Sequence, residues 1–381
     1  MKITIAIDSL KGSLTSLEAG RGVEEGIKRV YPEAEIKVLP IADGGEGTAE
    51  ALVYSMNGRW ETVSVKDPLG REISARYGKI EKKKLAVMEM ASAAGLTFLK
   101  PNERNPLKAT TFGVGQMIRD AIQKGCRNFL FGIGGSATND GGAGMLAALG
   151  YELLDKEGKQ IRQGAEGLAQ LYRIETKHVI PELSECTFRI ACDVTNPLCG
   201  ENGCSAVFGP QKGADPEMVR QMDGWLEHFA KLTEEIRPAI TRDHPGAGAA
   251  GGLGFAFLAY TNAKLESGID MVLQESGVEA YIRESDFVIT GEGKLDEQTV
   301  MGKAPIGVAG LAKLYNKPVI AFSGAAGENA KICNEKGIDA FFPIVRKPVS
   351  AEEAMDTENA KKNMADTAEQ VFRLIRAVRK Q

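Results

Sequence analysis

Residues 129–144 read FLFGIGGSATNDGGAG, a short apolar run followed at once by a turn of glycines and small polar residues. The run Phe129–Ile133 is typical of a buried strand, and the turn leads into a helical segment that begins near Gly142. A strand, a turn and a helix in this order are the parts of a βαβ unit, which predicts a parallel sheet. A turn without side chains exposes backbone N–H groups beside a helix N-terminus, a setting that binds anions.

The same layout occurs three more times along the chain. An apolar run precedes DGGEGT at residues 43–48, CDVTNP at residues 192–197 and TGEGKLD at residues 290–296. The Asp and Glu residues in or beside these turns are groups that hold Mg²⁺ or transfer a proton. One such turn would be weak evidence, but four in one chain predict a site for phosphoryl transfer.

Short β-branched runs alternate with longer amphipathic segments over most of the chain, a pattern that predicts βαβ units and a largely parallel sheet. Two runs near the N-terminus and three near the C-terminus resemble one another in length and composition. We therefore expect a Rossmann-like or flavodoxin-like α/β domain with a parallel sheet, built discontinuously from residues 1–62 and 272–381. The polar tail from Ala351 is expected to form a surface helix.

The pattern changes between these two segments. Residues 60–90 are typical of short strands joined by a turn at Asp67–Gly70 rather than of another βαβ unit. We interpret this change as the entry to an inserted, mixed α/β domain over residues 63–271, with the active-site cleft between the two domains. The chain has 381 residues, more than one hydrophobic core usually supports, so two domains fit its length.

The composition excludes several classes of partner. Lys and Arg total 47 against 51 Asp and Glu, a net charge of −4, which provides no basic footprint for nucleic acid or for an anionic membrane. No apolar stretch has the length of a membrane span and the N-terminus lacks a signal-peptide cleavage site, which predicts a cytoplasmic location. Scattered cysteines without metal-ligand spacing are interpreted as reduced thiols. Self-association into a homo-oligomer is left open.

Two common nucleotide-binding motifs were considered. A Walker A loop is absent, because Gly293-Lys294 is followed by Leu and Gly302-Lys303 by Ala. The dinucleotide fingerprint G-x-G-x-x-G/A is met at Gly132–Ala137 after an apolar strand, which is the best case for a nucleotide-linked dehydrogenase. However, extra residues separate its glycines from the helix, and a second match at Gly246–Gly251 does not follow a strand. A dehydrogenase and a non-catalytic ligand sensor remain the alternatives to phosphoryl transfer.

The turns are predicted to bind substrate or phosphate through N–H, hydroxyl and amide groups, with charged residues beside them. The predicted binding residues are Asp43, Gly44, Gly45, Glu46, Gly134, Gly135, Ser136, Thr138, Asn139, Asn196, Gly248 and Lys303. Several of them lie at the ends of strands, which is the edge where parallel sheets bind ligands. The structural alternative is a set of tight strand-to-helix connections with Asn or Asp caps.

Catalytic and metal-binding roles are assigned to charged residues. We predict catalytic roles for Asp193, Lys11 and Lys294, and Mg²⁺ ligation by Asp296, Glu292 and Asp140. Asp193 follows a strand, where a carboxylate backed by apolar residues suits a general base that orients or deprotonates a hydroxyl. Lys294 lies between two carboxylates in TGEGKLD, so it is placed to neutralise phosphate charge beside a metal ion. An Asx turn and solvated loop charges are the alternative interpretations.

Longer blocks of sequence occur in order along the whole chain. They include DSLKGS at 8–13, GIGGSATNDGGAG at 132–144, ACDVTNPL at 191–198, FGPQKGA at 208–214 and VITGEGKLDEQTVMGKAPIGVA at 288–309. Together these blocks resemble the glycerate kinase type 1 family of bacteria. The resemblance implies a kinase that uses ATP and Mg²⁺, acts on glycerate and has two α/β domains. Family members commonly form 2-phosphoglycerate in the breakdown of glyoxylate, glycerate or sugar acids.

Overall fold

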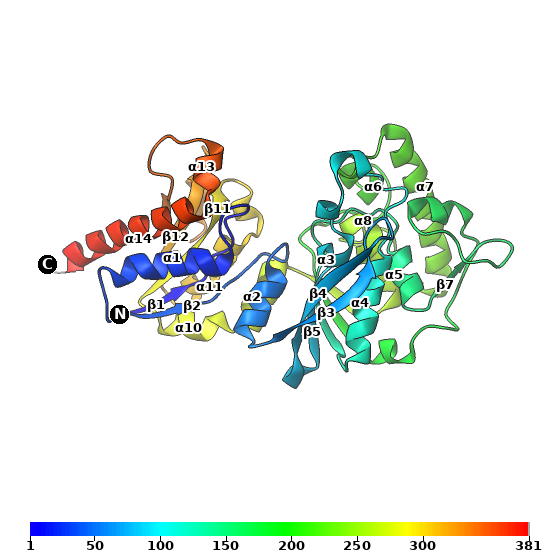
Figure 1. Ribbon diagram of the computed structural model, residues 1–381, viewed down its shortest axis with the longest axis horizontal. Coiled ribbons are helices and arrows are strands. Elements are labelled where there is room, and N and C mark those ends of the chain that lie inside the picture. Colours follow the sequence, from blue (N-terminus) through cyan, green and yellow to red (C-terminus); the bar gives the residue numbers. More distant parts are fainter. Residues whose placement is uncertain (380–381) are drawn as a thin grey trace. The chain divides into compact units, whose positions relative to one another are not determined.

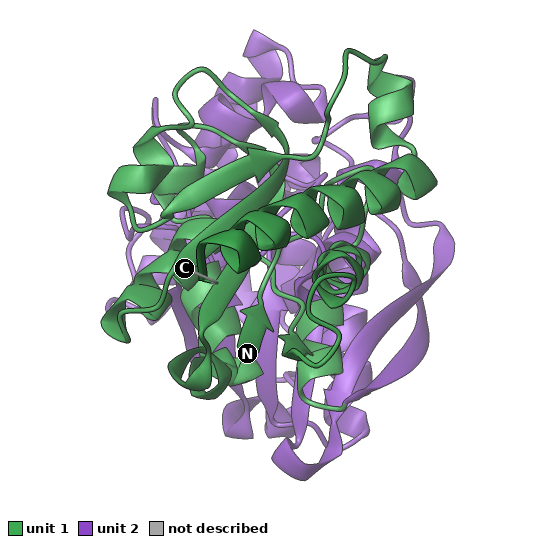
Figure 2. Ribbon diagram, turned by 90° about the vertical axis from the view of Figure 1, so that its left-hand side faces the viewer, with its two compact units in different colours: residues 1–43, 50–57, 267–381 green, residues 44–49, 58–266 purple. Residues whose placement is uncertain are grey.

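The computed structural model describes residues 1–379, which form two compact units (Figures 1 and 2). Unit 1 consists of residues 1–43, 50–57 and those from 267 onward, so both ends of the chain contribute to it. Unit 2 consists of residues 44–49 and 58–266. The short segment 44–49 belongs to unit 2 although the residues on either side of it belong to unit 1.

A parallel sheet of five strands forms the centre of unit 1, in the order β13-β12-β11-β1-β2. Its strands are β1 (Lys2–Ile5), β2 (Glu35–Val38), β11 (Phe287–Leu295), β12 (Val319–Ala326) and β13 (Ala340–Pro343). Ile3, Thr4 and Ile5 of β1 are all buried, as expected for an inner strand covered on both faces. This sheet confirms the predicted Rossmann-like or flavodoxin-like architecture.

Unit 1 also contains helices, several of which contact the strands of this sheet. They are α1 (Ser16–Lys28), α2 (Thr48–Ser55, which begins in unit 2), α9 (Gly268–Ser276), α10 (Val278–Glu284), α11 (Ala304–Leu314), α12 (Ile332–Glu335), α13 (Ala351–Met355) and α14 (Thr357–Arg379). A capping box starts α1: Thr15 Oγ1 accepts the Glu18 N–H and the Glu18 carboxylate accepts the Thr15 N–H. Helix α14 lies along α1 (Figure 1) and buries Met364 and Phe372, so the predicted surface helix also contributes to the core.

Unit 2 contains a mixed sheet of six strands in the order β10-β9-β6-β5-β4-β3. Its strands are β3 (Arg59–Lys66), β4 (Glu72–Ile80), β5 (Leu85–Glu89), β6 (Asn128–Gly132), β9 (Thr187–Ala191) and β10 (Ala263–Glu266). The pairs β3–β4 and β4–β5 are antiparallel and the other pairs are parallel. The turn predicted at Asp67–Gly70 joins β3 to β4 and is closed by a hydrogen bond from the Gly70 N–H to the Asp67 carbonyl. The mixed α/β character predicted for this part of the chain is confirmed.

Six α-helices pack around the second sheet. They are α3 (Ala91–Ala94), α4 (Phe112–Gln123), α5 (Ala143–Ala148), α6 (Cys204–Phe208), α7 (Pro216–Ile236) and α8 (Ala249–Tyr260), and a small sheet pairs β7 (Glu152–Leu154) with β8 (Arg173–Glu175). The core is partly aromatic: the rings of Phe129 and Phe188, on adjacent strands, stack with centroids 4.5 Å apart. Among the helices of residues 1–379, none combines the length and the hydropathy needed to cross a membrane.

Candidate functional site

In unit 1, charged side chains collect at one edge of the parallel sheet. Asp8 follows β1, Asp43 lies beyond the end of β2, and Glu292 is in the last part of β11. These three strands are neighbours and run in the same direction, so their carboxyl ends meet at this edge. Asp8 is only 5% exposed and Glu292 only 7%, so two carboxyl groups are withdrawn from water here.

Asp8 is the most perturbed acid of this edge. Burial raises the pKa of its carboxyl to about 7, and the carboxylates of Asp43 and Glu292 contribute to the rise. The Ser9 N–H, 2.6 Å from Oδ1, and the charge of Lys11 act in the opposite direction. A carboxyl group that titrates near neutral pH is suited to accept a proton from a hydroxyl.

Asp8 is absent from the residues predicted above, although the block DSLKGS begins with it. Lys11 of the same block is among the predicted residues because of its charge. Asp8 stands directly after an apolar strand, at the carboxyl edge of a parallel sheet. The same signal led to the prediction for Asp193, and applied to the first strand it would have identified Asp8.

Glu292 and Asp296 both contact cationic or hydroxyl groups from the end of β11 and the segment that follows it. The Thr299 hydroxyl donates to Glu292 Oε1 at 2.6 Å, and Lys303 Nζ lies 3.8 Å from Glu292 Oε2. Burial raises the pKa of Glu292, and Thr299 and Lys303 oppose the rise. The hydrogen bond from Lys294, whose Nζ is 3.1 Å from Asp296 Oδ2, is the main cause that lowers the pKa of Asp296. The structure therefore places four of the predicted residues in the end of β11 and the segment after it, as two acid–lysine pairs.

Lys11 belongs to the same edge of unit 1. A Cβ built on Gly293 would be 3.5 Å from the Lys11 backbone nitrogen, so the loops DSLKGS and TGEGKLD lie side by side. The side chains of Lys11 and Lys294 are both exposed. Exposed ammonium groups beside buried carboxylates at a strand edge are a suitable surface for the phosphates of a nucleotide.

In unit 2, the glycine-rich turn after β6 carries free donors. Gly134 and Gly135 are exposed, and Gly135 has a φ of +72°, which favours glycine. The backbone N–H groups of Gly134, Gly135 and Ser136 have no hydrogen-bond acceptor among residues 1–379. Neighbouring free N–H groups in a turn are what an anion-binding nest needs, as the predicted role of these residues requires.

Asp140, further along the same turn, is fully buried and surrounded by donors. Its carboxylate accepts the Thr111 N–H at 2.8 Å, the Thr111 hydroxyl at 2.9 Å, the Gly142 N–H at 3.1 Å and the Gly144 N–H at 3.2 Å. Burial raises the pKa of Asp140, and these hydrogen bonds oppose the rise. These donors satisfy the buried carboxylate, and metal ligation by Asp140 stays a prediction.

Three loops of unit 2 meet at the buried part of this turn. Gly251 approaches Thr138 so closely that a Cβ on Gly251 would lie 2.0 Å from the Thr138 carbonyl oxygen. The ammonium group of Lys212 donates to the same oxygen at 2.6 Å. In the loop next to Gly251, the Gly248 N–H donates to the Asn196 carbonyl at 3.0 Å. The structure therefore brings together the predicted residues Thr138, Asn196 and Gly248, and adds Lys212, which the sequence analysis did not select.

The DGGEGT motif also contributes to unit 2. A Cβ on Gly134 would be 3.5 Å from the Cα of Gly45, so this motif lies against the glycine-rich turn. Glu89, at the end of β5, accepts the Ala49 N–H at 2.8 Å. Burial raises the pKa of Glu89, and the exposed Glu46 adds to the rise. Glu89 is a further perturbed acid at a strand end that the sequence analysis did not select.

Asp193 lies just after β9 with an exposed side chain. Because β9 pairs in parallel with β6, Asp193 is at the same edge of the sheet as the glycine-rich turn. The Asn196 amide that follows it donates to the Asn202 carbonyl at 2.9 Å. The position of Asp193 is thus as predicted, and its role as a base stays a prediction.

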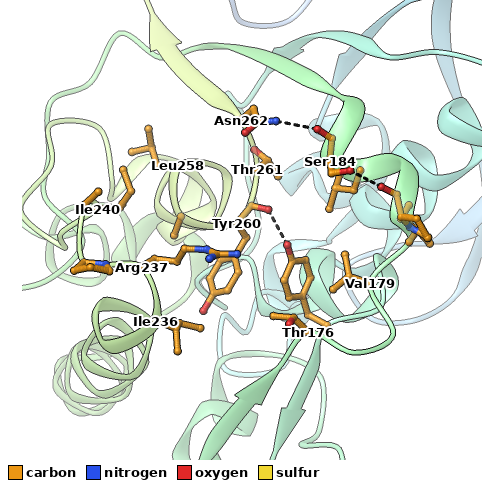
Figure 3. Close-up of a pocket in the computed structure, with 17 residues that line it drawn as sticks. Thr176, Val179, Ser184, Ile236, Arg237, Ile240, Leu258, Tyr260, Thr261 and Asn262 are labelled. Atoms are coloured by element: carbon orange, nitrogen blue, oxygen red, sulfur yellow. Dashed lines mark hydrogen bonds between the residues drawn. The ribbon is translucent and has the colours of Figure 1, made fainter.

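A separate pocket of about 800 Å³ lies elsewhere in unit 2 (Figure 3). It is lined by the segments that precede β9 and β10 and by the C-terminal ends of α7 and α8, including Ser184, Asn262 and Arg237. The Asn262 amide donates to the Ser184 carbonyl at 3.3 Å and joins two of these segments. Residues before parallel strands lie at the amino edge of the sheet, so this pocket is opposite the edge that carries Asp193.

Parallel sheets with donor-rich turns and titratable carboxylates at their carboxyl edges define an α/β enzyme for small anionic ligands. The model of the family described as "Glycerate kinase family" matches residues 3–376. The chain is 45% identical to the glycerate kinase of Haemophilus influenzae over 98% of this chain and 99% of that protein. It is 43% identical to the glycerate 2-kinase of Escherichia coli K12 over 93% of each chain.

A solved structure gives the same result. The "Crystal structure of putative glycerate kinase 2 from Salmonella typhimurium LT2" matches with a TM-score of 0.91 and 45% identity, covering 100% of both chains. The chain belongs to the glycerate kinase family. Membership of this family confirms the predicted enzyme class, an ATP-dependent kinase.

Proposed function

We propose that this chain transfers the γ-phosphoryl group of ATP to the 2-hydroxyl of D-glycerate and yields 2-phosphoglycerate. The observation that carries this proposal is the match to proteins named glycerate kinase over nearly the whole chain. The donor-rich turn of unit 2 and the acid–lysine edge of unit 1 supply groups that phosphoryl transfer needs. Assignment to the type 1 subfamily, a role in glyoxylate, glycerate or sugar-acid breakdown, and a cytoplasmic location are parts of the same proposal.

In this reaction the glycerate hydroxyl oxygen forms a bond to the γ-phosphorus while the bond from that phosphorus to the β,γ-bridging oxygen breaks. The hydroxyl proton passes to a carboxylate, and ADP leaves. Each unit supplies one candidate for the proton acceptor, Asp8 in unit 1 and Asp193 in unit 2. Asp8 is the stronger candidate, because a buried acid with a pKa of about 7 is matched to proton transfer at neutral pH.

Mg²⁺ is expected to accompany ATP and to neutralise charge on its phosphates. Within residues 1–379, no group of three or more His, Cys, Asp or Glu side chains is arranged to hold a metal ion. In kinases the phosphates and water supply most Mg²⁺ ligands and the protein adds one or two carboxylates, so the residues present fit this mode. Glu292 and Asp296 would hold the ion, and Lys294 and Lys303 already pair with them.

The direct test is to incubate the purified protein with ATP, Mg²⁺ and D-glycerate, and separately with NAD and glycerate. Phosphorus NMR of the first mixture should show 2-phosphoglycerate. A 3-phosphoglycerate product would overturn the position of transfer. Reduction of NAD without phosphoryl transfer would favour the dehydrogenase alternative, and binding without turnover in either mixture would favour the sensor.

A further inference from the structure

The block FGPQKGA contains a lysine whose burial the proposed function does not explain. Lys212 ends a short 3₁₀ helix (Pro210–Lys212) and is only 1% exposed. Its Nζ donates to the Thr138 carbonyl at 2.6 Å. No carboxylate within residues 1–379 lies at ion-pair distance from it. Asp140 raises the pKa of Lys212 but forms no ion pair with it, and a buried ammonium group without a contacting counter-charge is costly, so this site favours the arrival of an anion.

A second buried lysine of unit 2 shows the usual solution. Lys79 is 6% exposed and its Nζ donates to a backbone carbonyl, that of Lys124, at 2.8 Å. Unlike Lys212, Lys79 also has a carboxylate partner, because Glu81 Oε2 lies 3.2 Å from its Nζ. The two lysines therefore match in burial and in backbone contact, and differ in whether a carboxylate lies at ion-pair distance.

The residues around Lys212 have unused polar atoms as well. Thr138 Oγ1 and Asn139 Oδ1 are buried without a hydrogen-bond partner within residues 1–379. The adjoining Gly134–Ser136 segment carries the free N–H groups described above. The turn thus combines free N–H donors and an unpartnered hydroxyl, and the ammonium group of Lys212 contacts it at the Thr138 carbonyl. Native proteins seldom leave several buried polar groups unpaired without a ligand or water.

We propose that Lys212 is a positioning residue that prepares this turn for an oxyanion of a substrate, either the carboxylate of glycerate or a phosphate of ATP. This inference rests on the proposed function. The ammonium group fixes the Thr138 peptide and adds positive charge at the buried end of the turn. In a site shielded from water such a charge acts more strongly than it would at the surface.

The ionisation of Lys212 is consistent with this role. Burial lowers the pKa of Lys212 to about 8, while Cys204 and Asp140 act in the opposite direction. Lys212 is therefore protonated in most molecules at pH 7. A bound oxyanion would favour the charged form further, since an opposite charge raises the pKa of a lysine.

The test compares Lys212→Met, which removes the charge and the donor, with Lys212→Gln, which keeps a donor for the Thr138 carbonyl. Lys79→Met is the matched control, because it removes a buried lysine whose charge is paired. For both Lys212 variants we expect the KM of one anionic substrate to rise roughly 10- to 100-fold, the range of a lost charge-assisted contact, with a smaller change in kcat. Whether the KM of glycerate or that of ATP rises identifies the oxyanion.

Several outcomes would overturn the proposal. One is a KM for both substrates within about twofold of wild type in Lys212→Met. Another is a rise in KM in Lys79→Met as large as that in Lys212→Met. The third is a wild-type KM in Lys212→Gln, which would show that the charge is dispensable. Thermal unfolding of each variant identifies loss of fold, and the Gln variant keeps the test available if the Met variant does not fold.

Calorimetry separates this inference from the proposed function. Glycerate and inorganic tripolyphosphate are titrated into the wild-type protein and the same three variants. If the wild type turns over no glycerate, the proposed function fails. Oxyanion binding that weakens at least about 10-fold in both Lys212 variants but not in Lys79→Met would still support the role of Lys212. Absence of binding to wild type, or equal binding to all four proteins, would overturn it.

Discussion

Asp8 of unit 1 and Asp140 of unit 2 both follow parallel strands, and both carboxyl groups are almost completely withdrawn from water. Asp140 accepts three N–H groups and the hydroxyls of Thr111 and Thr110, so its charge is met by fixed dipoles. Asp8 accepts the Ser9 N–H and lies near two other carboxylates that disfavour its charge. A buried acid surrounded by donors stabilises a turn, whereas one left near like charges is available for proton transfer.

Replacing Asp8 by Asn should give the largest effect on activity. If Asp8 accepts the proton of the glycerate hydroxyl, kcat/KM at pH 8 should fall by about 10²-fold or more, a typical contribution of a general base. In the wild type, kcat/KM should rise with pH through about 7 as Asp8 loses its proton, and this rise should be absent in Asp8→Asn. Steady-state kinetics from pH 5.5 to about 8.5 checks both points. A variant with wild-type kcat/KM would remove Asp8 from the mechanism.

The same substitution should stabilise the protein at alkaline pH. The folded state keeps the Asp8 proton up to about pH 7, while the unfolded state loses it near 3.8. The folded state therefore binds more protons between these values, and the free energy of unfolding of the wild type falls as pH rises through this window. The raised pKa of Asp8 lowers the free energy of unfolding at alkaline pH by at most about 4 kcal/mol. Asp8→Asn should recover this loss at pH 8 but not at pH 4. Urea unfolding at both pH values measures it, and equal stability of the two proteins at pH 8 would contradict a desolvated Asp8.

Asp193→Asn tests the base that the sequence predicted. If Asp193 is the base, Asp193→Asn should lower kcat by about 10²-fold or more while the fold is preserved. We expect a smaller loss than in Asp8→Asn, because the exposed Asp193 side chain is not desolvated. Kinetics of the two variants in parallel decides between them. A loss at Asp193 that equals or exceeds the loss at Asp8 would return the role to Asp193, and activity within a few-fold of wild type would reject it.

Asp140→Asn should lower the free energy of unfolding, whereas Asp8→Asn should raise it at alkaline pH. An amide has one acceptor oxygen, so some of the donors from Thr111, Gly142 and Gly144 would lose their partner. Each buried donor left unsatisfied costs about 1–3 kcal/mol, and we expect a loss of that order in the free energy of unfolding. Urea unfolding at pH 7 measures the change. A variant as stable as the wild type would show that these hydrogen bonds contribute no net stability.

The sequence was sufficient to predict the fold because its signals are local. The strand Phe129–Ile133 is observed as Asn128–Gly132, and the helix expected to begin near Gly142 begins at Ala143. The polar tail was also predicted to be a surface helix, but the sequence alone did not show that Met364 would be buried against α1. That contact depends on two segments at opposite ends of the chain.

The site was harder to predict, because burial and pairing decide the role of a charged residue. Asp140 and Asp8 are both acidic residues at turns after strands, and the sequence contains nothing that separates a carboxylate surrounded by donors from one with like-charged neighbours. Lys212 occurs in the block FGPQKGA, which looks polar. It is buried because it packs against a distant turn: its hydrogen-bond partner, Thr138, lies 74 residues earlier in the chain. Such residues become apparent only when the fold is known.

Asp296→Asn should produce the smallest effect, a weaker apparent affinity for Mg²⁺. The side chain of Asp296 is more exposed to water than that of Glu292, and its charge is already paired with Lys294. An Asn keeps an acceptor for the Gln298 N–H, which Asp296 Oδ1 now accepts at 2.9 Å, so the loop should keep its shape. Glu297→Gln is the control, because it removes one negative charge from the adjacent, exposed position. When activity is titrated with Mg²⁺, the Mg²⁺ concentration for half-maximal activity should rise a few-fold for Asp296→Asn and stay unchanged for the control. An unchanged value for Asp296→Asn would reject Asp296 as a ligand.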